Sequence, residues 1–456
     1  MDIKYNVFNI NSIFLEPEAQ MDKLIPQKFQ HSSLAYCILV STLRLLKNMA
    51  VTLFCVPFKY KFVGVAPYSH LYQGKILFRL PSLNNLRALN NVIERVKSKK
   101  KNVEVVDKVM EYNSYPILVM DIVSLFYLPV FWRGFLGLNQ SERRIVCYNM
   151  QNYVYTPGFV WFYNRILKRY RPECVVLAND HSFTTKPLEL LCEDYSIPCV
   201  YVQHASVTHA FPELHFSYSF LDGVDALKKY TSKGKKLKGK AILLGAVRYD
   251  ALSKYRVERN DKKRNCIGIA INEFDDNTIT NGICEEILEE FPHVYIKVRS
   301  HPAMKNHPFI FSNKERIIYT CATDETMVDY LDSIDLQISN DSGVHLDAVL
   351  GGVRTIAFNF SKYEFGDNYE YLKNGLIHLA ENVDQLFQFI ENENYFVVNI
   401  NNVRQYDESY GKNYAGHCSD IIADFILSNS DEKIITEKYS VEEHNNAGFS
   451  YYVLPE

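Results

Sequence analysis

The stretch Asp335–Phe360 (DLQISNDSGVHLDAVLGGVRTIAFNF) restricts most strongly what this chain can fold into. Its first residues, Asp335–Ser339, predict a short buried strand, and Asn340–Gly343 predict a tight polar turn. Val344–Leu350 has apolar residues at helical spacing, and Thr355–Phe360 starts another buried strand after two glycines. Strand, turn, helix and strand in this order form the repeating unit of a parallel sheet, so we predict an α/β fold.

The polar turn is the first candidate binding site. It consists of Asn340, Asp341, Ser342 and Gly343, directly after Ser339 at the end of the predicted strand. Free backbone N–H groups, the positive end of a helix dipole and small hydroxyls suit a phosphate group or a ribose. The alternative is an ordinary capped helix of an α/β domain.

Length and composition limit the class of protein. The 456 residues exceed a single hydrophobic core, so we expect two domains with additions. The net charge of −3 gives no reason to expect a nucleic-acid partner. The ten cysteines form no CxxC pair, and the first residues lack a signal-peptide pattern. We therefore expect a cytoplasmic protein without disulfides and without a metal site.

Two long apolar segments lie in the N-terminal third, which has no motif of its own. Arg44 and Lys47 interrupt Cys37–Phe58, and Asp121, Pro129 and Arg133 interrupt residues 117–138. Neither segment is a clean transmembrane span, and we expect each to be a buried helix. The alternative is an amphipathic surface that places the protein peripherally on the inner membrane.

A strand–helix–strand unit follows this region. Glu173–Ala178 and Ile197–Gln203 predict two buried strands, and Lys186–Tyr195 predicts the amphipathic helix between them. The polar residues after the strands, Asn179–Ser182 and Gln203–His209, should meet at the carboxyl edge of the sheet. Ligands bind at this edge in such folds.

Two residues at this edge are candidate catalytic groups. His204 is a candidate general base for an acceptor hydroxyl, because an imidazole titrates near neutral pH. Asp180 is the competing base, or the residue that orients His204. The alternative is that both residues only cap the strand and the helix.

A charged segment divides the chain into domains. Residues 1–250 form the predicted N-terminal domain with extra helices, and 251–264 form the linker, because they contain few apolar residues. Residues 265–428 form the second predicted α/β domain, which begins with the buried strand Cys266–Asn272. Residues 429–456 form a tail.

The second domain has a further polar strand end. Residues 294–299 predict a strand that leads into Ser300, His301 and Pro302. His301 can donate to a leaving phosphate, and Arg299 can add a fixed positive charge. Together with the turn at 339–343, these residues form the predicted nucleotide site, although Pro302 can also simply end the strand.

These motifs together resemble the GT-B glycosyltransferases. The matching stretches are VVLANDHS…IPCVYVQHA, AILLGAVRYD, KVRSHP and DLQISNDSGVHLDAVLGGVRTIAF, about half of the chain. The resemblance implies two Rossmann-like domains that face each other across a cleft, with the acceptor bound by the first and the nucleotide-activated donor by the second. It assigns acceptor activation to His204, and phosphate or nucleotide binding to His301, Ser339 and Ser342. Ala205 departs from the pattern, since the family has glycine after this histidine.

The resemblance also implies an activity. The chain is most similar to bacterial capsule and lipopolysaccharide enzymes that transfer sialic acid or Kdo-type sugars from CMP donors. It is also similar to CDP-glycerol-dependent teichoic acid polymerases. The expected partners are a nucleotide-sugar, as substrate and not as cofactor, and an oligosaccharide or lipid-linked glycan acceptor. Alternatives are transfer from CDP-glycerol or UDP-sugars, a sugar-nucleotide 2-epimerase, and a non-enzymatic membrane-associated scaffold.

Overall fold

The computed structural model describes residues 5–16, 25–56, 65–100, 102–107, 115–258, 264–304, 309–312, 315–392, 399–428, 442–446 and 449–454. The chain divides into two compact units. Unit 1 contains Met1–Asp222, Ala226–Val247 and Ser419–Glu456, and unit 2 contains Gly223–Asp225 and Arg248–Cys418.

Unit 1 is built on an eight-stranded sheet. In spatial order its strands are β13 (Glu442–Asn446), β14 (Phe449–Val453), β6 (Lys240–Leu243), β5 (Tyr218–Leu221), β4 (Cys199–Val202), β3 (Cys174–Leu177), β1 (Ile76–Leu80) and β2 (Val103–Asp107). All neighbours pair in parallel except β13 with β14. The order β2-β1-β3-β4-β5 is flavodoxin-like, and its direction reverses between β1 and β3, where ligands bind in such sheets.

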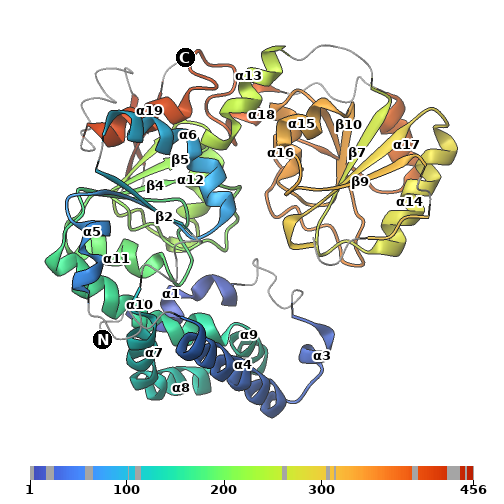
Figure 1. Cartoon of the computed structure of the whole chain (residues 1–456). Helices are drawn as coiled ribbons and strands as arrows, with labels where there is room; N and C mark the ends of the chain where they lie inside the picture. Colours follow the sequence, from blue (N-terminus) through green and yellow to red (C-terminus); the bar gives the residue numbers. More distant parts are fainter. Residues whose placement is uncertain are drawn as a thin grey trace. The chain divides into compact units, whose positions relative to one another are not determined.

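Helices cover this sheet and continue into a second layer (Figure 1). Around the sheet lie α5 (Ser69–Tyr72), α6 (Leu83–Lys99), α11 (Lys186–Asp194), α12 (Val224–Tyr230) and α19 (Cys418–Leu427). Helix α10 (Met150–Arg169) packs on α11 and also on the helical layer, which we define as α1 (Val7–Ile10), α4 (Leu34–Cys55), α7 (Ile117–Phe126), α8 (Leu128–Gly137) and α9 (Gln140–Tyr148). Gly158 permits the close approach of α10 to α7, because a Cβ there would lie 2.6 Å from the carbonyl oxygen of Met120.

The apolar segments of the helical layer are only partly buried. Helix α4 buries Cys37, Ser41 and Leu45, whereas Leu43 and Phe54 are exposed. By length and composition α4 could cross a membrane, as could α7 and α8 together, although these two helices meet at a 55° bend. We expected both apolar segments to be buried helices. Both are helical, but the expectation of burial is wrong for the sides that face outward.

Unit 2 is a six-stranded, fully parallel sheet. Its strands, in spatial order, are β12 (His378–Ala380), β11 (Arg354–Phe358), β10 (Leu336–Ser339), β7 (Cys266–Ile271), β8 (Tyr295–Ser300) and β9 (Ile317–Cys321). Read from β9, this is the Rossmann order 3-2-1-4-5-6, which reverses between β7 and β10. Every residue of β7 is buried, as expected for a strand covered on both faces.

Helices lie on both faces of this sheet (Figure 1). Helices α14 (Asn277–Glu290) and α17 (Val383–Glu391) share a core with one face, and α15 (Met327–Asp332) and α16 (Val344–Leu350) lie on the other. The unit also contains α13 (Asp250–Glu258) and α18 (Ile400–Arg404). Two Rossmann-like parallel sheets with flanking helices confirm the predicted α/β fold class.

The predicted boundaries need two corrections. Part of the predicted linker 251–264 is helix α13, and residues 259–263 lie outside the described residues. Helix α19 belongs to unit 1 and not to the second domain, and the predicted tail contributes β14, which pairs with β6. The apolar side of SDIIADFIL and the alternation of FSYYV suit a helix and a strand, but only long-range packing assigns them to unit 1.

A buried carboxyl group on α7 provides a test of the helical layer. Asp121 is 4% exposed, and burial raises its pKa from 3.8 to about 7. The folded protein therefore favours the protonated form, and ionisation costs stability as the pH rises. We expect Asp121→Asn to stabilise the protein by an amount that grows between about pH 4 and 7 and then levels off at no more than about 4 kcal/mol.

Urea unfolding at several pH values would measure this difference. The exposed Asp384→Asn serves as the control and should show a much smaller pH-dependent change. The prediction would be contradicted if Asp121→Asn changed the free energy of unfolding by the same amount at about pH 4 and at about pH 7.

Candidate functional site

The carboxyl end of β3 contains an ordered polar turn in unit 1. The Asn179 side-chain oxygen accepts bonds from the backbone N–H of Ser182 at 2.7 Å and of His181 at 3.3 Å, and from the Thr185 hydroxyl at 3.0 Å. This Asx-type turn fixes the chain between β3 and α11. It lies next to the point where the strand order of unit 1 reverses.

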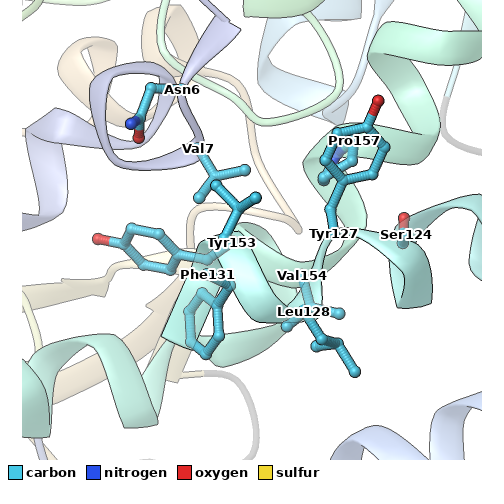
Figure 2. Close-up of a pocket in the computed structure, with 10 residues that line it drawn as sticks. Asn6, Val7, Ser124, Tyr127, Leu128, Phe131, Tyr153, Val154 and Pro157 are labelled. Atoms are coloured by element: carbon cyan, nitrogen blue, oxygen red, sulfur yellow. The ribbon is translucent and has the colours of Figure 1, made fainter. Parts of the chain in front are cut away.

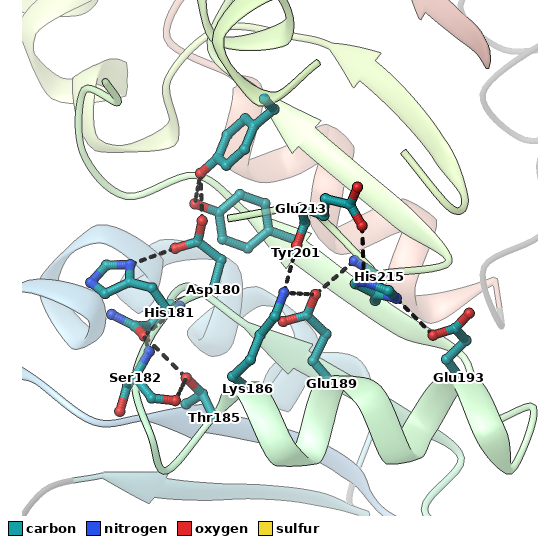
Figure 3. A network of polar contacts seen from close by, with 12 residues as sticks. Asp180, His181, Ser182, Thr185, Lys186, Glu189, Glu193, Tyr201, Glu213 and His215 are labelled. Atoms are coloured by element: carbon teal, nitrogen blue, oxygen red, sulfur yellow. Dashed lines mark hydrogen bonds and ion pairs between the residues drawn. The ribbon is translucent and has the colours of Figure 1, made fainter. Parts of the chain in front are cut away.

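Asp180 is fully buried at this turn, and both of its oxygens have partners (Figure 3). Oδ1 lies 2.8 Å from Nδ1 of His181, and Oδ2 accepts a 2.9 Å bond from the Tyr230 hydroxyl. The Tyr230 hydroxyl also lies 2.9 Å from that of Tyr201. Burial raises the pKa of Asp180, but the bond and charge of His181, with Lys186 and Tyr230, outweigh it and hold the pKa below its ordinary value.

Asp180 contacts His181 and not the predicted partner His204. Its side chain has no exposed surface. The His181 side chain is 25% exposed, and its ring packs edge-on against Phe211 at 5.1 Å. A carboxylate on Nδ1 leaves Nε2 as the nitrogen available to a ligand.

The other predicted histidine, His204, lies half-buried directly after β4. Gln203 connects the end of β4 to β5, because its side-chain oxygen accepts a 3.0 Å hydrogen bond from the Asp222 N–H.

A second network lies on α11, beside the first (Figure 3). Lys186 Nζ donates to Glu189 Oε1 at 2.9 Å, and the same oxygen accepts the His215 N–H at 2.7 Å. His215 Nδ1 lies 2.8 Å from Glu193 Oε2. Burial raises the pKa of Glu189 to about 7. Lys186 and His215 also line a pocket of about 500 Å³, with Phe211 on its wall.

In unit 2, the polar side chains of the predicted turn mainly hold the turn itself. Ser339 is buried, and its hydroxyl donates to the Ala270 carbonyl at 2.8 Å. The Asn340 amide donates to Asp275 Oδ1 at 2.9 Å, across the switch point between β10 and β7. Asp341 Oδ2 accepts two bonds from Asn368, at 2.6 and 2.7 Å. The Ser339 hydroxyl and the Asp341 carboxylate are therefore both engaged within the unit.

The rest of the turn is more open. Ser342 and Gly343 are half-buried, and Ser342 Oγ accepts from the Val344 N–H at 3.4 Å. Behind the turn, His345 is fully buried, with Nε2 2.9 Å from the Asn340 carbonyl and Nδ1 2.6 Å from the Thr355 hydroxyl. Burial lowers the pKa of His345 to about 4, so the ring is neutral near pH 7.

His301 is the most open of the predicted donor-site side chains. It follows β8, its side chain is 51% exposed, and Nδ1 lies 3.5 Å from Glu273 Oε2. The bond and charge of His301 lower the pKa of Glu273. Pro302 starts a short 3₁₀ turn directly afterwards.

Arg299 does not join His301. Its guanidinium lies 3.2 Å from Glu325 Oε1 and 5.0 Å from the centre of the Tyr330 ring, and its side chain is 8% exposed. Because side chains alternate along a strand, Arg299 and Ser300 point to opposite faces. The structure thus directs the predicted positive charge into the unit, where Glu325 neutralises it.

Sequence reasoning did not single out three residues at these sites. His181 lies within the polar stretch 179–182, and Glu273 directly follows the predicted strand Cys266–Asn272, so their positions were a usable signal. Asp275 lies in the loop after the same strand; it is buried at the switch point, and burial raises its pKa to about 6. Among the described residues, no group of three or more His, Cys, Asp or Glu side chains could hold a metal ion.

No protein-family model matches the sequence, and no curated protein matches it. Solved structures of similar fold include a protein designated a UDP-N-acetylglucosamine 2-epimerase from Listeria monocytogenes, with 14% identity, a TM-score of 0.50, and coverage of 79% of this chain and 97% of that one. The UDP-GlcNAc 2-epimerase of Neisseria meningitidis has 15% identity, 78% and 100% coverage and a TM-score of 0.48. The wall teichoic acid polymerase TagF has 13% identity, 87% and 98% coverage and a TM-score of 0.46. At these identities the likeness concerns the fold, which is of the GT-B type.

The buried His345 makes a testable contribution to this fold. Since its folded pKa of about 4 lies below the ordinary 6.5, the unfolded chain binds more protons between these values. The contribution of the neutral His345 ring to the free energy of unfolding is therefore complete above about pH 6.5, and it is lost as the pH falls toward 4. Between about pH 7 and 5 the wild type should lose roughly 2 kcal/mol that His345→Gln does not lose.

Guanidinium unfolding at both pH values measures this gap. The exposed His378→Gln, on β12 of the same sheet, should keep the pH dependence of the wild type. If His345→Gln keeps it as well, His345 is not the group that titrates.

Proposed function

We propose that this protein is a glycosyltransferase that moves a sugar from a nucleotide-activated donor to a growing bacterial surface polysaccharide. The observation that supports it is an accessible imidazole at the carboxyl end of a parallel strand in each unit. His301 follows β8 in unit 2, and His181 follows β3 in unit 1. A transferase of this type needs one group that accepts a proton from the acceptor and one that stabilises the departing phosphate.

Unit 2 is the proposed donor site. Its Rossmann strand order directs a nucleotide to the edge where β7 and β10 end, close to Asn340 and Asp275. His301 is proposed to donate a hydrogen bond to the leaving phosphate, with the Glu273 carboxylate beside its ring. The half-buried Ser342 and Gly343 offer a hydroxyl and backbone N–H groups to the same ligand.

Unit 1 is the proposed acceptor site. Asp180 holds Nδ1 of His181, so Nε2 is available to remove the proton from an acceptor hydroxyl. The pocket beside α11 is lined by charged side chains of both signs (Lys186, Lys235, Lys238, Glu16 and Glu213) and by Phe211, a mixture that suits a polar glycan. In this proposal His181 replaces His204 as the leading candidate base.

The favoured donor is a CMP-activated ulosonic acid of the sialic, pseudaminic or Kdo type. This choice rests on the resemblance of the HP and QHA sequences to enzymes that use such donors. The nucleotide-sugar is a substrate, and the proposed reaction uses no metal. CDP-glycerol and UDP-sugar donors are the alternatives on the same scaffold.

A sugar-nucleotide 2-epimerase is the second candidate function. It is favoured by the likeness of fold to the Listeria protein. An epimerase would convert a UDP-sugar in the absence of any acceptor, whereas a transferase would require the acceptor for turnover.

The donor site can be tested with His301→Ala. We expect transfer to fall by at least about 10²-fold, because a stabilising donor to the leaving group is lost. The stabilisation of the protein by its nucleotide in a thermal-shift assay with CMP, CDP, UDP and GDP should also decrease. His378→Ala, an exposed histidine of the same unit, is the matched control. Unchanged turnover and binding in His301→Ala would remove the donor-site assignment.

The proposed base can be tested by comparing two histidines of unit 1. His181→Ala should lower kcat by about 10²–10⁴-fold and leave the nucleotide thermal shift intact, because the base acts on the acceptor. His204→Ala should have a smaller effect. Asp180→Asn, which keeps the shape but not the charge that orients His181, should lower kcat with little change in the donor KM. The reverse ranking of the two histidines would return the role of base to His204.

A further inference from the structure

The helical layer of unit 1 exposes large apolar side chains on two neighbouring elements. On α4, Leu39, Leu43 and Leu46 are 55–58% exposed and Phe54 is 80% exposed. At the bend between α7 and α8, Phe126 is 79% exposed, and Leu136 is 66% exposed further along α8. We call these six side chains the apolar face. Since α4 packs against α7, its two parts belong to one packed layer.

Helix α4 is apolar on two opposite sides. Its buried side chains Cys37, Ser41 and Leu45 recur every four residues, and Leu39, Leu43 and Leu46 recur at helical spacing on the outward side. A helix at the surface of a globular protein normally has a polar outward side. The outward side of α4 is therefore built for a second apolar environment.

The exposed charges on α4 and α8 are all basic. Arg44 and Lys47 are exposed on α4, and Arg133 is exposed on α8. Residues 34–56 contain no aspartate or glutamate, and in residues 117–138 the sole acid, Asp121, is buried. Basic residues that flank an apolar helix surface are complementary to anionic lipid headgroups, which lie above the hydrocarbon of a bilayer.

An apolar pocket of about 110 Å³ opens beside the bend (Figure 2). Leu128, Phe131 and Val154 line it, and Val130, which also lines it, is 53% exposed. A hollow of this chemistry at the edge of an apolar surface suits a hydrocarbon segment better than a polar ligand.

The contacts of α4 favour a position in the membrane interface over a transmembrane one. The Ser41 hydroxyl donates to the Cys147 carbonyl of α9 at 2.6 Å, and the Asn48 amide donates to Gln151 of α10 at 3.2 Å. These bonds and the packing of Cys37 and Leu45 attach α4 to the folded unit along its length. A helix attached in this way can present one side to a bilayer but cannot leave the unit to cross it.

We propose that the apolar face, with Arg44, Lys47 and Arg133, is a docking surface for an anionic lipid bilayer. The outward side chains of α4 and of the α7–α8 bend enter the headgroup–acyl boundary, and the three basic residues contact lipid phosphates. This proposal is independent of the reaction that the protein catalyses.

Flotation of the full-length protein with phosphatidylcholine vesicles, with and without phosphatidylglycerol, tests this surface. The wild type should float with the anionic vesicles. Leu43→Glu combined with Leu46→Glu should reduce the bound fraction by roughly 10-fold or more, because two carboxylates would have to enter the hydrocarbon boundary. Arg44→Gln combined with Lys47→Gln should weaken binding to anionic vesicles at low salt, with a smaller difference at high salt.

Ile318→Glu is the matched control, because Ile318 is 50% exposed on strand β9 of unit 2. It should float like the wild type, and unchanged melting temperatures would show that all variants are folded. Equal flotation of Leu43→Glu/Leu46→Glu and wild type would overturn the proposal. So would a wild type that ignores vesicles and forms a dimer that this double variant dissociates, since a second copy would then cover the face.

Discussion

Parallel sheets that are buried on both faces force the polar chemistry of this protein to the strand ends. Strand β7 has no exposed residue, and β3, β4 and β10 are equally buried. Along such strands a polar side chain needs an internal partner, as the Ser339 hydroxyl has in the Ala270 carbonyl. Only the turns at the carboxyl ends combine backbone freedom with access to a ligand, and the candidate groups of both units lie there.

A buried acid that holds polar groups of a strand-end turn appears in both units. Asp180 holds His181 and Tyr230, and Asp275 holds Asn340 and the backbone of its own turn. The two acids differ in charge preference, because the partners of Asp180 lower its pKa whereas burial raises that of Asp275. The partners of Asp180 thus favour a charged carboxylate beside the His181 ring, and Asp275 fixes the switch point through its hydrogen bonds.

The helical layer differs from the two sheets because it exposes apolar side chains as well as burying them. Its inner residues form an ordinary apolar core, but α4 and the α7–α8 bend expose a second apolar surface without acidic residues. This surface is separated from the strand ends of unit 1 by α10, which packs on both α11 and the layer. Contact with lipid and chemistry at the sheet edge can therefore occupy different parts of the same unit.

The sequence by itself determined the α/β class, the strand–turn–helix–strand unit around Asn340–Gly343 and the position of His301 after a buried strand. These features are local, since apolar runs, turn residues and their order are read within about thirty residues. Tertiary structure decided where side chains point and what they contact. It turned Arg299 toward Glu325, paired Asp180 with His181, and added the C-terminal strand β14 to the sheet of unit 1. Such choices depend on partners far away in the sequence, because a buried charge or an unpaired strand edge is satisfied only by the packing of the whole unit.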